Sequence, residues 1–221
     1  KADDALAEIE RLKKELSESK SEAEQLRLTK AYNKETDALS ATDWFQKGYN
    51  AAINEEWDKA LSFFLRAIEL DPDDAKAYYN LGLAYYNQGN YTKAIELCEK
   101  AIELDPDDAA AHNNLGSAYY NQGNYTKAIE LYEKAIELKP DYADAYYNMG
   151  LAYRKQGNYD KAIQLYEKAI ELDPDYADAY NNLGVAYHKS DFDTALSYYK
   201  KAARLGHQGI QDWLKKNGYN W

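Results

Sequence analysis

The sequence predicts an all-α protein built from stacked helix pairs, and three observations carry this prediction. The segment YYNQGNYTKAIEL at residues 85–97 recurs unchanged at residues 119–131, 34 positions further along the chain. Each copy holds two stretches in which apolar residues recur at helical spacing. The four prolines of the chain each follow the second of these stretches, where proline ends a helix: Pro72, Pro106, Pro140 and Pro174.

The 34-residue period defines five repeats, which we number in chain order: 41–74, 75–108, 109–142, 143–176 and 177–205. Repeats 2 and 3 differ at seven positions, so 27 of their 34 residues are identical. In repeat 4, a first helix is expected around DAYYNMGLAYRKQ and a second around YDKAIQLYEKAIEL. A glycine between the two helices supplies the turn, at Gly89, Gly123 and Gly157.

Small residues recur at one position of each helix, which predicts that the two helices of a repeat approach each other closely. The first helices carry glycine there, at Gly48, Gly82, Gly116, Gly150 and Gly184. The second helices carry alanine, at Ala60, Ala94, Ala128, Ala162 and Ala195. A larger side chain would push the helices apart. Because one repeat cannot bury its own apolar face, stacking of neighbouring repeats is expected to form the core.

We call the positions that correspond to one another in successive repeats a column. The columns of this chain resemble those of the tetratricopeptide repeat, in which an aromatic residue, Leu-Gly, Tyr, Ala, a second aromatic, Ala and Pro recur within 34 residues. The resemblance covers residues 41–205. It implies antiparallel helix pairs stacked into a right-handed superhelical solenoid of five pairs, whose first helices line a concave groove. Repeat 1 departs from the pattern at Lys47, Ala51 and Glu55, and repeat 5 lacks one residue and the closing proline. End repeats are commonly atypical.

Residues 1–28 carry a heptad pattern and predict one long N-terminal helix, followed by a connector at residues 29–40. Its larger apolar positions are Ile9, Leu12, Leu16 and Leu26, which alternate with small residues such as Ala2 and Ala23. Glutamates at the g positions (Glu8, Glu15, Glu22) and cations at the following e positions (Lys13, Lys20, Arg27) favour a parallel coiled coil. Two alternatives stay open: a solvated helix packed on repeat 1, or a helix in the groove of a neighbouring molecule, which would build a filament.

Residues 206–221 predict a C-terminal capping helix and a tail. Gly206 ends the preceding helix, and Asn217-Gly218 ends the next. Ile210, Trp213 and Leu214 would face the repeats. The stretch KAARLGHQGIQDWL resembles the close of a Sel1-like repeat.

Composition disfavours several classes of function. A net charge of -11 repels nucleic acid and anionic membranes. No apolar run is long enough to cross a membrane, and the single cysteine, Cys98, is expected to be a buried thiol. The chain starts at Lys1 without a methionine. The compartment therefore stays open: a cytoplasmic location is slightly favoured, and an extracytoplasmic one would follow if a targeting segment had been removed.

No catalytic constellation is visible, so an enzyme is not predicted, and neither is a metal or a cofactor. The three histidines, His112, His188 and His207, are scattered, and none is grouped with cysteines or carboxylates as metal ligands. His112 stands in an aromatic column of the repeat, where filling the core explains it. Loops that bind nucleotides and nucleophile elbows are absent from the sequence.

Binding of a protein or peptide is the predicted function, because the columns without a packing role differ between repeats. By the resemblance, the groove would be lined by Phe45, Tyr49, Tyr79, Asn80, Leu83, Tyr86, Asn113, Asn114, Ser117, Tyr120, Tyr147, Asn148, Leu151, Arg154, Asn181, Asn182, Val185 and His188. Aromatic, aliphatic and amide side chains suit an amphipathic helix or an apolar peptide.

The basic side chains suggest how such a guest could be oriented. Chaperone-binding members of the family hold a terminal carboxylate with lysines, but here those columns mostly carry aromatic residues or asparagine. Only Arg154, Lys155, His188 and Lys189 form a basic patch, which would receive an acidic end of the guest. The alternative function is a structural protein that assembles with itself through the N-terminal helix and the ends of the repeat array.

Overall fold

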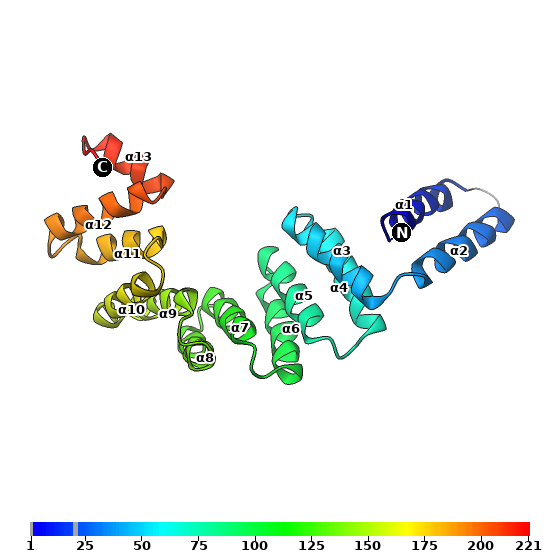
Figure 1. Ribbon diagram of the computed structural model, residues 1–221, viewed down its shortest axis with the longest axis horizontal. Helices are drawn as coiled ribbons and strands as arrows, with labels where there is room; N and C mark the ends of the chain where they lie inside the picture. Colours follow the sequence, from blue (N-terminus) through cyan, green and yellow to red (C-terminus); the bar gives the residue numbers. More distant parts are fainter. Residues whose placement is uncertain (1, 20–21) are drawn as a thin grey trace. The chain divides into compact units, whose positions relative to one another are not determined.

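The computed structural model describes residues 2–19 and 22–221, and all the regular structure within these residues is α-helical, in 13 helices without a strand. The chain divides into two compact units, residues 1–90 and residues 91–221. Figure 1 labels the helices of both. The predicted all-α class is confirmed, and consecutive helices pack as pairs in the manner of a tetratricopeptide solenoid.

Unit 1 contains five helices: α1 (Ala2–Glu18), α2 (Glu22–Asp37), α3 (Ala41–Ile53), α4 (Trp57–Leu70) and α5 (Ala75–Asn87). Helices α3 and α4 form repeat 1, and α5 packs against α4. A capping box fixes the start of α3: Asp43 N donates to Ser40 Oγ (3.2 Å), and Ser40 N donates to Asp43 Oδ2 (3.0 Å). Helix α3 therefore begins at Ala41.

The N-terminal segment differs from the predicted single helix. Helix α1 ends at Glu18 and α2 begins at Glu22, and the two helices pack against each other. Helix α2 also occupies the predicted connector, because it continues to Asp37. The physical reason is burial: Ile9 and Leu12 are 2% and 3% exposed within this chain. Lys20 lies outside the described residues, as do the side chains of Ala2, Glu22, Ala23 and Leu26.

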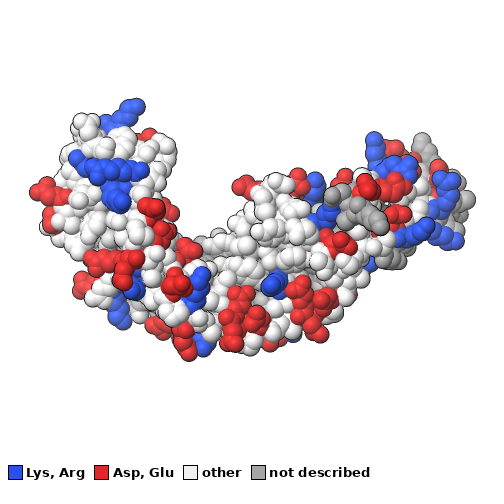
Figure 2. Space-filling view, viewed as in Figure 1, with Lys and Arg blue, Asp and Glu red and all other residues white. Residues whose placement is uncertain are grey.

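Unit 2 contains eight helices: α6 (Tyr91–Leu104), α7 (Ala109–Asn121), α8 (Tyr125–Leu138), α9 (Ala143–Lys155), α10 (Tyr159–Leu172), α11 (Ala177–Tyr187), α12 (Phe192–Arg204) and α13 (Gln208–Lys216). The pairs α7/α8, α9/α10 and α11/α12 are repeats 3, 4 and 5, and each second helix also packs on the first helix of the next repeat. Lys and Arg side chains gather over α12 and α13 in Figure 2. The helices of repeat 2, α5 and α6, belong to different units and are described separately.

Polar residues start the helices and tie neighbouring repeats together. Asp108 accepts a hydrogen bond from Ala110 N (2.8 Å) at the start of α7. Gln122 at the end of α7 donates to Thr92 Oγ1 (3.3 Å), and Gln156 at the end of α9 donates to Thr126 Oγ1 (3.2 Å). The same tie thus recurs at successive repeats, which keeps their stacking uniform.

The glycine column is a steric requirement, as predicted. A Cβ atom built on Gly150 would lie 2.6 Å from Cε1 of Tyr166, whose side chain is fully buried. Gly48, Gly116 and Gly184 meet the aromatic rings of Phe64, Tyr132 and Tyr199 in the same way. Each first helix can therefore approach its partner only because this position lacks a side chain.

The turn between helices also has a steric explanation. Gly123 and Gly157 adopt φ of +83° and +80°, which is the left-handed region that favours glycine. In repeat 1 the same turn contains Glu55 at φ +58°. A side chain in this conformation is strained, so repeat 1 carries a local cost that the other turns avoid.

Helix α13 packs against α12 and covers the end of unit 2. Leu214 is fully buried, and the ring of Trp213 lies 5.2 Å from that of Tyr199. The predicted cap is therefore present. The likeness of this end to a Sel1-like repeat stays a prediction.

Candidate functional site

The candidate site is the set of first-helix positions that the sequence predicted for peptide binding, which we call the first-helix face. In unit 2 it comprises Asn113, Asn114, Ser117 and Tyr120 on α7, Tyr147, Asn148, Leu151 and Arg154 on α9, Asn181, Asn182 and Val185 on α11, and His188 directly after α11. In unit 1 it comprises Phe45 and Tyr49 on α3, and Tyr79, Asn80, Leu83 and Tyr86 on α5. These are the residues that the sequence predicted for peptide binding.

A line of polar contacts joins the first helices of unit 2. Asn148 Nδ2 on α9 donates to Asn113 Oδ1 on α7 (3.1 Å), and Asn182 Nδ2 on α11 donates to Tyr147 Oη on α9 (3.0 Å). Asn113 and Asn182 are only 5% and 7% exposed. Their amides therefore hold adjacent repeats in register and offer a partner little surface. The sequence assigned both residues to peptide binding. For Asn182 a contrary signal was present, because asparagine recurs at its position in repeats 2 to 5, as expected for a packing role, whereas the position of Asn113 varies between repeats.

Tyr147 packs against two other tyrosine rings of repeat 4. Its ring centroid is 4.8 Å from that of Tyr176 and 5.8 Å from that of Tyr166. Burial raises the pKa of Tyr147 to about 12, and the nearby Asp178 carboxylate adds to the rise. Tyr147 is thus mainly a structural residue, although it is only half-buried.

The more accessible part of the face in unit 2 is apolar and aromatic. Val185 is 44% exposed, Leu151 and Tyr120 are half-buried, and His188 is exposed. The Tyr120 ring packs at 5.4 Å from Tyr125 at the start of α8. These side chains provide apolar surface that a partner can bury.

In unit 1 the face is also largely aromatic. Tyr49 is 45% exposed, and the half-buried Phe45 packs 5.7 Å from Phe64. Tyr79, Leu83 and Tyr86 are half-buried. Asn80 Nδ2 donates to Lys76 O within α5 (2.8 Å), so this amide too is engaged by its own helix.

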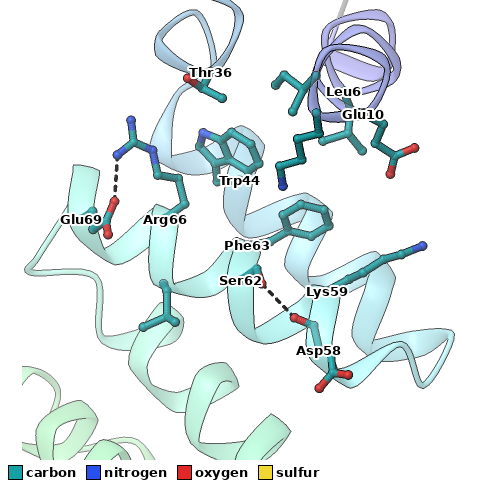
Figure 3. A pocket seen from close by; sticks show the side chains of 13 residues that line it. Leu6, Glu10, Thr36, Trp44, Asp58, Lys59, Ser62, Phe63, Arg66 and Glu69 are labelled. Carbon is teal, nitrogen blue, oxygen red and sulfur yellow. Dashed lines mark hydrogen bonds and ion pairs between the residues drawn. The ribbon is translucent and has the colours of Figure 1, made fainter. Parts of the chain in front are cut away.

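The structure reveals a cleft in unit 1 that sequence reasoning missed. It has a volume of about 760 Å³ and lies between α1, α3 and α4, with Leu6, Trp44 and Phe63 among its lining residues. Its charges are of both signs and are largely paired, as for Arg66 with Glu69 (2.7 Å) (Figure 3). The cleft exists because α1 packs onto repeat 1, which was one of the open alternatives for the N-terminal segment, whereas the cleft itself was not predicted.

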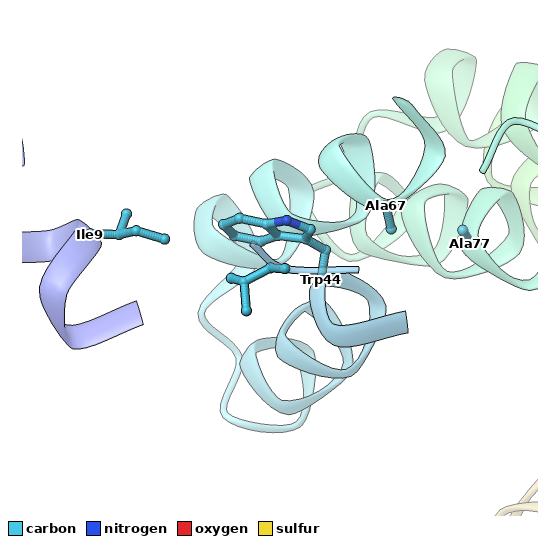
Figure 4. Packing of buried hydrophobic residues seen from close by; sticks show 5 residues of the cluster. Ile9, Trp44, Ala67 and Ala77 are labelled. Carbon is cyan, nitrogen blue, oxygen red and sulfur yellow. The ribbon is translucent and has the colours of Figure 1, made fainter. Parts of the chain in front are cut away.

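Beneath this cleft, the N-terminal helices share a core with repeat 1. Ile9 packs with Leu39 and Trp44, and Ala67 and Ala77 belong to the same cluster (Figure 4). The rings of Trp44 and Phe63 lie 5.6 Å apart. Ile9 and Leu12, which the sequence predicted as an oligomerisation seam with Leu16 and Leu26, are therefore buried inside the chain, whereas Leu16 is half-buried.

A second cleft lies in unit 2, at the predicted basic patch. It also has a volume of about 760 Å³, and Arg154, Lys155, His188 and Lys189 line it together with Tyr159 and Tyr199. His188 Nδ1 lies 3.3 Å from Tyr199 Oη. Burial raises the pKa of Tyr166, and the neighbouring Arg154 guanidinium opposes that rise. The four basic residues are thus brought together, as the sequence predicted.

The remaining reactive side chains have structural surroundings. Cys98 is 2% exposed, and burial raises the pKa of its thiol to about 12. His112 fills the core, with Nε2 3.0 Å from Pro106 O. Tyr146 makes the equivalent contact to Pro140 O (3.3 Å) in the next repeat. Across the described residues, no group of three or more His, Cys, Asp or Glu side chains is arranged to hold a metal ion.

Sequence comparison identifies the family. The tetratricopeptide repeat model matches residues 73–141, 107–175 and 141–205, and a second TPR repeat model matches residues 48–89. The chain belongs to the tetratricopeptide repeat (TPR) family. TPR proteins generally mediate protein–protein interactions. No curated protein matches the chain significantly. Within residues 2–19 and 22–221, none of the helices has the length and apolar character of a membrane span.

Solved TPR structures resemble this chain over most of its length. The crystal structure of MamA protein is 34% identical, and the alignment covers 77% of this chain and 94% of MamA at a TM-score of 0.64. MamA 41-end from Desulfovibrio magneticus RS-1 is 25% identical, with 76% and 96% covered and a TM-score of 0.66. YrrB, described as a TPR protein with an unusual peptide-binding site, is 26% identical, with 85% and 97% covered and a TM-score of 0.61.

Proposed function

We propose that this TPR chain is a non-enzymatic scaffold whose first-helix face binds an amphipathic helix or an apolar peptide. The observation that carries the proposal is exposed apolar surface at columns that vary between repeats. Val185 is 44% exposed, and its counterparts in repeats 2 to 4 are Leu83, Ser117 and Leu151. The columns that pack the repeats, such as the glycines against aromatic rings, hardly vary. Variation on a uniform support is what selective recognition of a partner requires.

The energetic argument favours burial of apolar side chains over polar contacts. Several amides that the face offers are already engaged within the chain, including those of Asn80, Asn148 and Asn182. A guest would therefore gain affinity mainly by covering Tyr120, Leu151 and Val185. Burying one such side chain fully contributes roughly 1.5–3 kcal/mol, before the cost of ordering the guest.

Selection of peptides that bind the full chain, from a displayed library of random peptides, tests this proposal. Binding of the selected peptides is measured by fluorescence anisotropy to the unmodified chain and to Val185→Glu. Leu70→Glu is the matched control, because Leu70 on α4 is 43% exposed and lies off the face. We expect Val185→Glu to weaken binding at least about tenfold and Leu70→Glu to leave it unchanged. Failure to select any peptide, or equal effects of both variants, would contradict the proposal.

Self-assembly through Ile9, Leu12, Leu16 and Leu26 stays the alternative. It now carries an added cost, because α1 would have to leave its packing against Trp44 before Ile9 could contact another molecule. Light scattering of the full chain at rising concentration separates the cases. A constant monomer mass argues against the alternative, whereas a parallel dimer or open-ended growth supports it.

A further inference from the structure

The cleft between repeats 4 and 5 has an unusual charge composition for this protein. The chain contains 38 acidic and 27 basic residues. Yet Arg154, Lys155, His188 and Lys189 all line this cleft of about 760 Å³, and no Asp or Glu is among its lining residues. The cleft of unit 1, by contrast, mixes acidic and basic side chains. A local excess of cations in an acidic protein marks a surface that attracts anions.

Comparison of the repeats shows that the fold does not need these cations. The two positions that hold Arg154-Lys155 in repeat 4 hold Tyr86-Asn87 in repeat 2 and Tyr120-Asn121 in repeat 3. In repeat 5 they hold His188-Lys189. These positions are the last two residues of α7 and α9 and directly follow α11, and the helix pairs α7/α8, α9/α10 and α11/α12 form in all three repeats. The change from Tyr-Asn to basic residues therefore alters the surface and leaves the architecture intact.

The cations of the cleft also lack the partners that other basic residues have. In the second helices of unit 2, lysines pair with a glutamate three residues on, as in Lys127–Glu130 (3.0 Å) and Lys168–Glu171 (2.8 Å). Within residues 91–221, all of which the structure describes, no carboxylate lies within 4.0 Å of the charged groups of Arg154, Lys155 or Lys189. Arg154 Nε is buried without a hydrogen-bond acceptor. This atom is shielded from solvent, and the Tyr166 hydroxyl lies beside the guanidinium. Because a guanidinium carries five N–H donors and Arg154 is only half-buried, its other donors can bind a ligand oxygen.

Apolar surface adjoins the cations. Tyr159 and Val185 line the same cleft and are 58% and 44% exposed. Arg154, Val185 and His188 are also members of the first-helix face, so the cleft continues the proposed peptide-binding surface. A ligand that fits both features carries negative charge beside an apolar side chain. Two or more adjacent carboxylates match Arg154, Lys155 and Lys189 better than one, because three positive charges converge there.

We propose that this cleft binds a run of at least two carboxylates in a peptide partner and so fixes where the partner's acidic end lies on the first-helix face. The inference rests on the proposed function, because it assumes a peptide on that face. Guanidinium and ammonium groups bind carboxylates by charge-assisted hydrogen bonds. Tyr159 and Val185 then contact the apolar residue of the peptide that adjoins its carboxylates. Carboxylates from Asp and Glu side chains or from a chain terminus have the chemistry that the cleft recognises.

The test uses the full chain and matched synthetic peptides. Peptides selected on the full chain are made in three forms: as selected, with Asp and Glu replaced by Asn and Gln, and with the C-terminus amidated. The site variant is R154Y with K155N, which restores the residues of repeats 2 and 3 and so preserves the fold. The control variant is K215Q with K216Q on α13, which removes the same two charges outside the cleft. Circular dichroism confirms that both variants are folded.

We expect the selected peptides to be acidic. Their forms with Asn and Gln in place of Asp and Glu should bind at least about tenfold more weakly, and this difference should shrink as the salt concentration is raised. R154Y with K155N should remove this preference, so that the selected peptides and their Asn/Gln forms bind that variant equally, whereas the control variant should keep the preference. A loss of affinity only on C-terminal amidation would assign the cleft to a chain terminus. Equal binding of the selected peptides and their Asn/Gln forms to the unmodified chain would contradict the carboxylate site but not the proposed peptide binding. Selection of no peptide would overturn both.

Discussion

Replacing Gly150 by alanine is expected to destabilise repeat 4, although the same change in an exposed helix would stabilise it. The added Cβ would lie 2.6 Å from Cε1 and 2.9 Å from Cδ1 of Tyr166. Carbon atoms normally pack at about 3.5–4.0 Å, so α9 and α10 must separate or the ring must move by roughly 1 Å. Tyr166 is fully buried, so its ring has no solvent-filled space to enter.

The magnitude follows from two opposing terms. Overpacking of a well-packed core typically costs about 1–3 kcal/mol, and the overlap at Gly150 places it in the upper half of that range. Alanine in place of glycine recovers about 1 kcal/mol of helix propensity. The net loss is therefore about 1–2 kcal/mol. Urea unfolding followed by far-ultraviolet circular dichroism measures it, and hydrogen exchange of α9 and α10 locates it, because repeats can open separately.

Two further variants make the reasoning falsifiable. Gly209→Ala is the control: the nearest atom to its added Cβ is His207 Cε1 at 3.5 Å, so stability should stay level or rise by up to about 1 kcal/mol. Tyr166→Leu removes the ring, so adding Gly150→Ala to it should cost less than in the unmodified chain. If Gly150→Ala alone stabilises the protein as much as Gly209→Ala, the close approach of α9 and α10 is not real.

Three other outcomes follow from the structure. Glu55→Gly should raise the free energy of unfolding by about 0.5–1 kcal/mol, because Glu55 has φ +58° where Gly123 and Gly157 stand in later repeats, and Glu55→Ala should give no such gain in urea unfolding. Burial raises the pKa of the Cys98 thiol to about 12, so Cys98 should resist iodoacetamide at mildly alkaline pH until urea unfolds the chain. Mass spectrometry detects the alkylation, and rapid alkylation of the folded protein would contradict the burial of this thiol. Burial raises the pKa of Tyr147 to about 12, from about 10 in the unfolded chain. The contribution of its neutral phenol to the free energy of unfolding is therefore complete below a pH of about 10 and is lost as the pH rises toward 12. Urea unfolding at a series of pH values checks this, and constant stability between pH of about 10 and 12 would refute it.

The repeat architecture was predictable because its causes are local and occur many times. In repeats 1, 3, 4 and 5 the glycine of the first helix faces an aromatic ring of the second, and in repeats 1 to 4 the turn holds a left-handed residue. Such requirements leave the same letter at the same place in successive repeats. Repetition therefore separates steric necessity from chance within a single sequence. The departure at Glu55 was visible in the sequence for the same reason, although its strained φ was not.

The N-terminal helices could not be predicted in the same way. A heptad stripe with Ile9 and Leu12 specifies an apolar seam but not the surface that covers it. That surface includes Trp44, which is far away in sequence and belongs to an atypical repeat without a second copy for comparison. The candidate site was predicted in part: the basic residues of the cleft were grouped correctly, whereas the burial of Asn113 and Asn182 depends on the spacing between neighbouring first helices.

A crystal structure of the full chain with its tightest selected peptide tests the central claim most directly. The account predicts peptide density along α7, α9 and α11, in contact with Leu151 and Val185, with an acidic residue at Arg154 and Lys189. Density on the second helices α8, α10 and α12, with the first-helix face empty, would contradict it.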